Sequence, residues 1–589
     1  MYLKRVLTRK PDGKSYAYLK LVEAFREGGR ARERVLHVLG REDTLKASGQ
    51  LNNLAAAFAR YDPPLIGTRR EVGPLLLVRH YLQRLGLIQI VGRHLPSHGR
   101  AQLSNGEVVA ALIANRLCAP SPLYDISGWA SSAALQELFG IPAMLLNDDR
   151  LGRLLDDFSR QAEAIRGAVA LAAIEQFGLE AGRLHLDLTS LRMYGAHESS
   201  ALVTKGWDAE RRVQHQVKVL EATTRLGLSL YVRPAKGSAA ELSVVAAALE
   251  QLSRLLPPGL VICTDSALGH LKTLCEVQRA NLGFVIPLRE STGFRERFLE
   301  EFGDKQALTP LTCVCRRQRD LPPEHRTRYR GALRSWPVED LQTAEQHTFR
   351  VAYIWSSEEE RSVREGRERA LSKAEERLAR VQRGLGGPHY KKPDDVLRRV
   401  GQILNPTVKA LLQVEVGERN GKPTLTFQRK AGTIERAQRL DGVYALASNL
   451  PDLTAQELLR LYKDQSLVEL RHRDLKGSLR VRPIFLHNDE RIEALISIVG
   501  LATLVFGLIE IDLRQALGEE QELPGLLPEG RAARPTGRNI LSAFQGLGLT
   551  YGPGGKIQTD RLTATQRRIL ELLNIDLPWP EQPRAGSAA

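Results

Sequence analysis

Strand-like and helical segments alternate in a fixed order between residues 183 and 289, and this order constrains the fold more than any other feature. Three β-rich segments come first, at residues 183–195, 213–223 and 226–234. They are followed by a helix candidate, a buried strand, a second helix candidate and a further strand, at residues 239–256, 259–267, 270–280 and 282–289. Three strands in a meander, followed by alternating helices and strands, predict a mixed α/β sheet.

This order is the one expected of an RNase H-like α/β domain. The flanking regions differ in pattern, and they predict a longer series of domains. Before the core we predict an N-terminal β meander (1–45) and a helical domain for DNA binding or dimerisation (46–180). The RNase H-like core has a first part (181–290) and a second part (441–515), separated by a β-rich insertion domain with a charged helix (291–440). A C-terminal helical region with a disordered tail follows (516–589).

The net charge of +16 and the isoelectric point of about 9.7 favour a polyanionic partner, with nucleic acid ahead of an anionic membrane. A soluble protein with a basic surface is the alternative. The five cysteines do not form the framework of a disulfide-stabilised chain, and the pair Cys313 and Cys315 lacks the second pair that a zinc site needs. The uncharged stretch at 494–509 is shorter than the roughly 20 residues that span a bilayer, so we predict a buried core helix.

Three acidic residues fall where metal-dependent chemistry needs them. Asp187 lies inside an apolar strand-like segment, and Asp265 ends the apolar run LVICTD at the carboxyl edge of its strand. Glu469 is on a late helix candidate. Taken singly, each aspartate could be a hydrogen-bonded structural carboxylate. Together, the three carboxylates predict an oxygen cage for Mg²⁺ or Mn²⁺, with two ions about 4 Å apart acting in phosphodiester displacement.

The sequence YKDQSLVELRHRDLK, at residues 462–476, predicts how the glutamate is presented. On a continuous helix, Tyr462, Gln465, Glu469 and Lys476 fall on one narrow stripe, at about 100° per residue. We therefore predict that Glu469 faces a metal ion while Tyr462, Gln465 and Lys476 bind flanking DNA phosphates.

At these residues the chain resembles the DDE transposases of the IS4 superfamily, and most closely the IS1634 family of bacterial insertion-sequence transposases. That family carries the motif Tyr-x2-Arg-x3-Glu-x6-Lys, to which Tyr462, Glu469 and Lys476 correspond, while Gln465 stands where the family has arginine. Arg473, which is near the same stripe, could compensate for the missing charge. The stretches HLDLTSL, VICTDSALGHL, LDGVYALASNL and LKGSLRVRPIFLHNDERIEALISIVGLA resemble the family's segments around the two aspartates and before and after the glutamate helix.

The resemblance implies an RNase H-like core that is interrupted by a β-rich insertion, with Asp187, Asp265 and Glu469 as catalytic metal ligands. It implies an enzyme that cleaves double-stranded DNA at terminal inverted repeats and joins the 3′ ends to target DNA. The expected complex is a homodimer or larger, in the bacterial cytoplasm and at the nucleoid when DNA is bound, with no membrane and no small-molecule cofactor. Two alternatives stay open: a catalytically decayed or domesticated DNA-binding relative, and a nuclease on the same core without strand transfer.

Overall fold

The computed structural model of the chain divides into two compact units. The first unit contains residues 1–72, 546–563 and 577–589, and the second contains residues 73–545 and 564–576. The structure describes residues 2–9, 15–27, 30–48, 50, 67–97, 101–195, 197–207, 212–255, 259–313, 318, 321–464, 471–474, 479, 484, 486–552 and 555–582. Three predicted site residues lie outside the described residues, namely Gln465, Glu469 and Lys476.

The first unit holds two small antiparallel sheets. The meander predicted at the N-terminus is present and leads into a short helix: β1 (Tyr2–Arg9), β2 (Ser15–Glu27), β3 (Arg30–Arg41) and α1 (Glu42–Ala47). The second sheet has the order β18-β17-β4 and joins distant parts of the chain: β4 (Arg69–Glu71), β17 (Gly548–Tyr551) and β18 (Ile557–Thr559). An ion pair of 2.6 Å between Arg69 and Asp560 supports this sheet.

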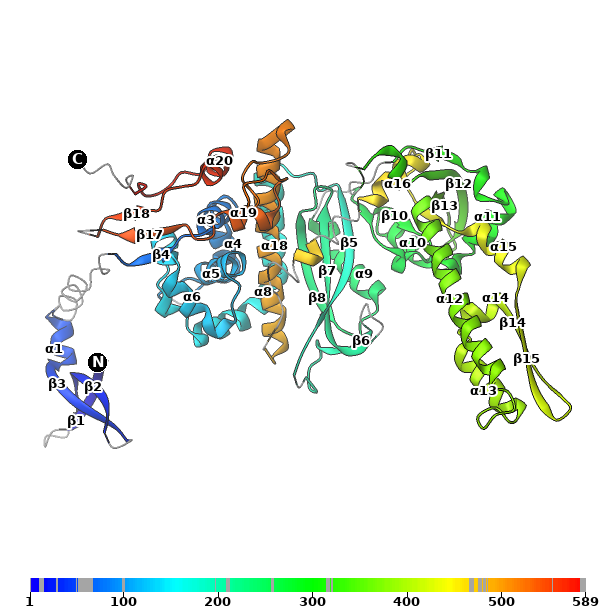
Figure 1. The fold of residues 1–589 in the computed structure, drawn as a ribbon. Helices are drawn as coiled ribbons and strands as arrows, with labels where there is room; N and C mark the ends of the chain where they lie inside the picture. The colour runs from blue at the N-terminus through cyan, green and yellow to red at the C-terminus, as the bar shows by residue number, and fades with distance from the viewer. Residues whose placement is uncertain are drawn as a thin grey trace. The chain divides into compact units, whose positions relative to one another are not determined.

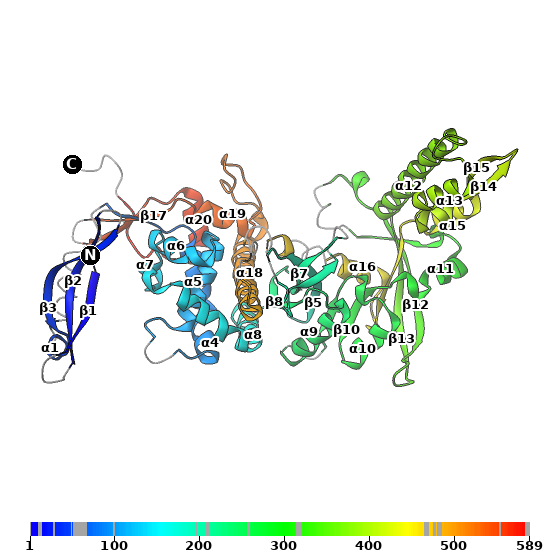
Figure 2. The same ribbon diagram turned by 90° about the horizontal axis from the view of Figure 1, so that it is seen from below.

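One long apolar helix, α18 (Asp489–Leu517), forms the centre of the second unit. It packs against the helices of the preceding region and against strand β8 of the main sheet (Figures 1 and 2). Its helical neighbours include α3 (Leu75–Arg84), α5 (Asn105–Cys118) and α8 (Asp148–Phe177). By length and composition α18 could cross a membrane, but 94% of its most apolar window is buried inside the protein. The prediction of a buried core helix is therefore confirmed.

The main sheet of the second unit contains ten strands. Five of them lie in the region where the sequence predicts the core: β5 (Arg183–Arg192), β7 (Val213–Thr224), β8 (Ser229–Lys236), β9 (Val261–Cys263) and β10 (Gly283–Pro287). Strands β5, β7 and β8 pair as an antiparallel meander, while β9 pairs parallel to β5 and β10 pairs parallel to β9. Helix α9 (Glu241–Leu255) precedes β9, and α10 (Leu271–Arg279) connects β9 to β10. Meander, helix, strand, helix and strand follow one another as the sequence predicts.

Residues 291–440 differ from the expected β-rich insertion in two ways. First, three of their strands extend the main sheet instead of forming a sheet of their own: β11 (Thr309–Leu311), β12 (Tyr329–Glu339) and β13 (Gln346–Ser356). They join it through β16 (Val443–Ser448), which follows the insertion in the sequence and lies between β10 and β13. Second, the remainder is largely helical and contains one two-stranded hairpin: α12 (Ser357–Arg383), α13 (Pro393–Ile403), α14 (Pro406–Leu411), β14 (Leu412–Arg419), β15 (Lys422–Arg429) and α15 (Ala431–Leu440).

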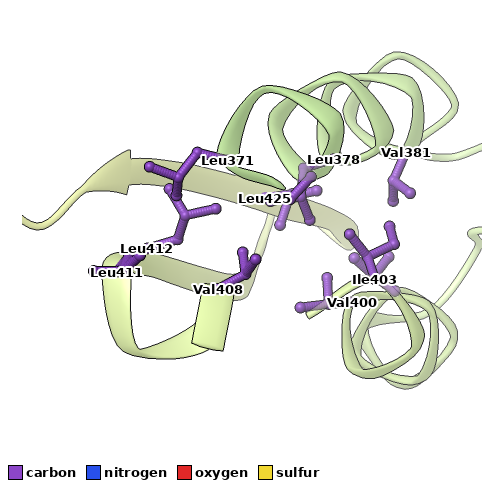
Figure 3. Close-up of a cluster of buried hydrophobic side chains, with 11 residues drawn as sticks. Leu371, Leu378, Val381, Val400, Ile403, Val408, Leu411, Leu412 and Leu425 are labelled. Atoms are coloured by element: carbon purple, nitrogen blue, oxygen red, sulfur yellow. The ribbon is translucent and has the colours of Figure 1, made fainter. Parts of the chain in front are cut away.

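The helical part of the insertion has a small hydrophobic core of its own. Figure 3 shows side chains of α12, α13 and α14 meeting those of the hairpin, among them Leu378, Ile403 and Leu425. The stretch VKALLQVEV at 408–416 looks like one strand in the sequence, yet its first part is helical. Asn405 accepts a hydrogen bond from the backbone N–H of Val408 and so caps this helix, which explains the difference.

Helix α16 (Ala455–Lys463) follows β16 and carries the first residue of the predicted catalytic motif. It begins with a capping box, in which the hydroxyl of Thr454 and the carboxylate of Glu457 satisfy each other's backbone N–H groups. Its buried residues, including Leu458 and Leu459, pack against β13, β12 and β10. The helix is thereby fixed to the strands that the insertion adds to the sheet.

The contact between α18 and β8 allows a test of the packing. A β-carbon added at Gly500 would lie 2.6 Å from the β-carbon of Val232, which is closer than carbon atoms pack. We expect Gly500→Ala to lower the free energy of unfolding by about 1–3 kcal/mol, because the helix must move off the sheet. Urea denaturation followed by circular dichroism measures this change.

The control is Gly366→Ala in the middle of α12, where no other atom lies within 4 Å of the added carbon. This variant should be more stable than the wild type by about 0.5–1 kcal/mol, because alanine favours a helix over glycine. The same response at both glycines would contradict the packing of α18 on β8.

Candidate active site

Asp187 and Asp265 lie on neighbouring parallel strands at the same edge of the sheet. Strand β5 pairs with β9 in a register that places His185 opposite Cys263. The pairing of β5 with β9 ends there, two residues before Asp187 and two residues before Asp265. Both aspartates therefore follow the paired residues at the same end of two neighbouring parallel strands.

The two carboxylates differ in their surroundings. Asp187 is half-buried, with 21% of its side chain exposed, and its Oδ1 accepts the backbone N–H of Leu188 at 2.9 Å. Asp265 is exposed and follows the end of β9, where its Oδ1 accepts the N–H of Ala267 at 2.9 Å. Each local hydrogen bond engages one carboxylate oxygen and orients the side chain.

Glu469 lies outside the described residues, but the chain immediately after it is placed beside Asp187. Helix α16 ends at Lys463, and residues 471–474 are again helical. His472, three residues after the glutamate, has its Nδ1 3.3 Å from Oδ2 of Asp187. His472, three positions after Glu469 in the sequence, therefore contacts the first predicted carboxylate.

His472 also contacts a second carboxylate, which sequence reasoning did not select. Its Nε2 lies 3.2 Å from Oε2 of Glu221 on β7, the residue that pairs with Asp187 across the two strands. Glu221 is fully buried, and burial raises its pKa, while the nearby His472 and Arg471 act in the opposite direction. One imidazole thus lies between a half-buried and a fully buried carboxylate. The only signal in the sequence is that Glu221 is the single acidic residue of the strand-like segment 213–223.

Arg471 anchors the same segment to the core helix. Its side chain is only 5% exposed, and its guanidinium lies 3.1 Å from Glu510 of α18 and 3.2 Å from Asp474. It also donates a hydrogen bond to the carbonyl of Gly227, in the turn between β7 and β8. Burial acts against ionisation of Glu510, but Arg471 and Arg514 outweigh it and hold the pKa of Glu510 below its ordinary value. A charged side chain inside the motif therefore has a structural partner on α18.

The remaining described motif residues have different environments. Tyr462 is partly buried on α16, with its ring centroid 6.1 Å from that of Tyr444. It lines a hollow that also includes Lys463, Ser266 and Arg289. Ser266, which directly follows Asp265 in the sequence, is part of the lining of this hollow.

Arg473 is exposed, unlike its neighbour Arg471, and lines a separate hollow with Arg514 and Arg538. Arg289 is a further exposed cation that no sequence pattern indicates. Its Nε donates to the carbonyl oxygen of Ser266 at 2.9 Å, so it is fixed beside Asp265.

Three family models match the chain. They are "Transposase DDE domain" over residues 181–505, "IS1634 family transposase, N-terminal domain" over residues 3–64, and "Domain of unknown function (DUF4277)" over residues 68–165. The first covers more than half of the chain. No curated protein matches the sequence. Among solved structures, the chain is similar to a piggyBac transposase synaptic complex with hairpin DNA, with 10% identity, a TM-score of 0.34, and 80% of this chain and 79% of that chain covered.

The buried pair of Arg471 and Glu510 predicts a large difference between two adjacent arginines. We expect Arg471→Met to reduce the free energy of unfolding by about 3–5 kcal/mol, because it leaves the buried Glu510 carboxylate without its nearest cation on the motif segment. Arg473→Met, at an exposed position, should change it by no more than about 0.5 kcal/mol. Urea denaturation followed by tryptophan fluorescence measures both, and equal losses would show that Arg471 is not an anchor.

Proposed function

Because the chain belongs to the IS1634 family of DDE transposases, we propose that it cleaves DNA at the ends of an insertion sequence and joins the 3′ ends to target DNA. In this proposal Asp187, Asp265 and Glu469 hold two divalent cations. One observation supports it: the β5–β9 pairing ends two residues before each aspartate, and His472, three residues after Glu469, lies 3.3 Å from Asp187.

The residues present fit hard divalent cations. Membership of the DDE family implies the use of a divalent metal, and a set of carboxylate oxygens favours Mg²⁺ or Mn²⁺. When bound, the ions would activate the attacking oxygen and stabilise the leaving one. The protein's own contribution is orientation, because the N–H groups of Leu188 and Ala267 hold one oxygen of each aspartate. His472 and Glu221 support Asp187 from the side of β7.

The cations around the carboxylates are suited to bind the DNA backbone. We assign phosphate contacts to Tyr462, Gln465, Arg473 and Lys476, and the chain's net charge of +16 supports a DNA partner. Gln465 can accept and donate hydrogen bonds but supplies no charge where the family motif has arginine. The fixed Arg289 beside Asp265 is a further candidate for this role.

The same proposal includes the organisation of the chain. An RNase H-like core is split by an insertion whose strands β11, β12 and β13 extend the sheet. Two copies would pair two DNA ends, as a homodimer in the cytoplasm at the nucleoid. The mechanism requires DNA as the substrate and no small-molecule cofactor.

The catalytic assignment is tested by three isosteric substitutions, Asp187→Asn, Asp265→Asn and Glu469→Gln. We expect each to lower Mg²⁺-dependent cleavage of a duplex containing the element's end by about a hundredfold or more, because metal coordination is worth several kcal/mol. Binding of the same duplex should be largely retained. Gel assays of cleavage and of binding, with the full-length protein, measure both quantities.

The control is Asp452→Asn, an exposed carboxylate in the loop before α16, which should cleave like the wild type. If Glu469→Gln cleaved DNA as well as the wild type, Glu469 would not be one of the catalytic metal ligands. Cleavage without joining would assign the chain to nucleases, and binding without cleavage by the wild type would assign it to decayed relatives.

The phosphate contacts are tested through the salt dependence of binding. Lys476→Ala and Arg473→Ala should each reduce the slope of log K against log salt by about one, because each removes one phosphate contact. Arg254→Ala, at the exposed end of α9 where Arg254 pairs with Glu250, is the control and should leave the slope unchanged. A slope that is unaltered in Lys476→Ala would give Lys476 a structural role.

A further inference from the structure

A second group of metal-ligating side chains lies away from the carboxylate site. Cys275, Asp340 and His347 place one sulfur, one oxygen and one nitrogen ligand atom within 4.8 Å of one another. The three residues come from helix α10, from the turn after β12 and from β13. We infer that they form a structural site for a borderline-soft divalent cation such as Zn²⁺. The bound cation would join the hairpin of β12 and β13 to helix α10 of the core.

The donor set distinguishes this site from the carboxylate site. A thiolate, an imidazole and one carboxylate suit Zn²⁺, which is bound by sulfur and nitrogen, and they suit Mg²⁺ poorly. Cys275 is 1% exposed and Asp340 is 3% exposed, while His347 is partly buried. The thiolate and the carboxylate together would balance the charge of a divalent ion.

One candidate ligand atom, Nε2 of His347, is buried and makes no hydrogen bond among the described residues. It faces Oδ2 of Asp340 at 3.9 Å, and that oxygen is paired with Arg279 at 3.2 Å. A buried polar atom without a hydrogen bond is costly, so Nε2 of His347 would gain from a cation that it shares with Asp340. This is the observation that points to a ligand rather than to packing alone.

The hairpin of β12 and β13 presents Asp340 and His347 in a fixed arrangement. The N–H of Gln342 donates to Oδ1 of Asp340 at 2.9 Å, which leaves Oδ2 on the side of His347. The backbone N–H of Asp340 also donates to the carbonyl of Glu345 at 2.8 Å and closes the turn. His347 stacks on Phe349 of the same strand, with ring centroids 6.0 Å apart. Ligands that are oriented in advance by such contacts favour metal binding.

Arg279 is the competing partner of Asp340. It lies one helical turn after Cys275, and its Nε is 3.2 Å from Oδ2 of Asp340. A carboxylate oxygen has two lone pairs, so the guanidinium and a metal ion can share it. Burial raises the pKa of the Cys275 thiol and Asp340 adds to this, while Arg279 lowers it. Metal binding must therefore release the thiol proton. An ion pair without metal is the rival interpretation.

The test measures metal in the full-length protein, purified without a polyhistidine tag. After dialysis to remove loosely bound ions, the wild type should retain about one Zn²⁺ per chain by mass spectrometry. Replacement with Co²⁺ should give the absorption band of a thiolate-bound cobalt ion. Both signals should be lost in Cys275→Ser and strongly reduced in His347→Gln, while Cys118→Ser, which alters a cysteine outside the cluster, should retain them.

Circular dichroism of each variant separates loss of metal from loss of fold. A folded wild type without bound Zn²⁺, or Cys275→Ser with unchanged zinc content, would overturn the site and leave the Arg279–Asp340 ion pair as the explanation. The site is independent of the proposed catalysis, because Asp187→Asn should be defective in cleavage and yet contain as much zinc as the wild type.

Discussion

The structure of the candidate active site depends on one buried ion pair, between Arg471 and Glu510. Arg471 belongs to the predicted motif segment, and Glu510 belongs to the helix around which the second unit is built. Removing a charged pair from water is costly, and a pair that persists in the core fixes the relative position of its two elements when further hydrogen bonds satisfy it. Here Glu510 also accepts the N–H of Gly537, and Arg471 also donates to Gly227. The anchor places the next residue, His472, between Asp187 and Glu221.

The sheet sets the second constraint on the site. A parallel register between β5 and β9 is possible only because a helix connects the meander to β9, and it brings two aspartates from distant parts of the sequence to one edge. On the other side of the sheet, β16 lies between β10 and β13, so helix α16 leaves the sheet beside the insertion strands. The insertion is therefore part of the surface from which Tyr462 approaches the site, rather than a separate appendage.

The sequence predicted those parts of the fold that depend on local patterns. Alternating strands and helices identified the core order, and the apolar run at 494–509 identified the core helix. Pairings between distant segments have no local signature. For this reason the sequence does not indicate the sheet formed by β4, β17 and β18, and it predicts a β-rich insertion domain where β12 and β13 extend the main sheet.

The same limit applies to the site residues. Asp187 and Asp265 stood out because each interrupts an apolar strand, but Glu221 was passed over in the same kind of context on β7. Its importance depends on its pairing opposite Asp187 and on the approach of His472, which are features of the tertiary structure. The stripe of Tyr462, Gln465, Glu469 and Lys476 assumed one continuous helix and stays a prediction, because only Tyr462 among them lies in the described residues.

Helix α10 connects the two kinds of metal chemistry that the residues support. It begins a few residues after Asp265, and the short turn at Ser266–Leu268 that Asp265 caps leads into it. Its second turn carries Cys275. Its last residue, Arg279, pairs with Asp340 in the turn between β12 and β13. A cation bound by Cys275, Asp340 and His347 would hold this helix at its far end while the oxygen ligands act at its beginning. The proposed zinc site would then stabilise the fold. The proposed carboxylate site would remain free to exchange its ions with those that accompany DNA.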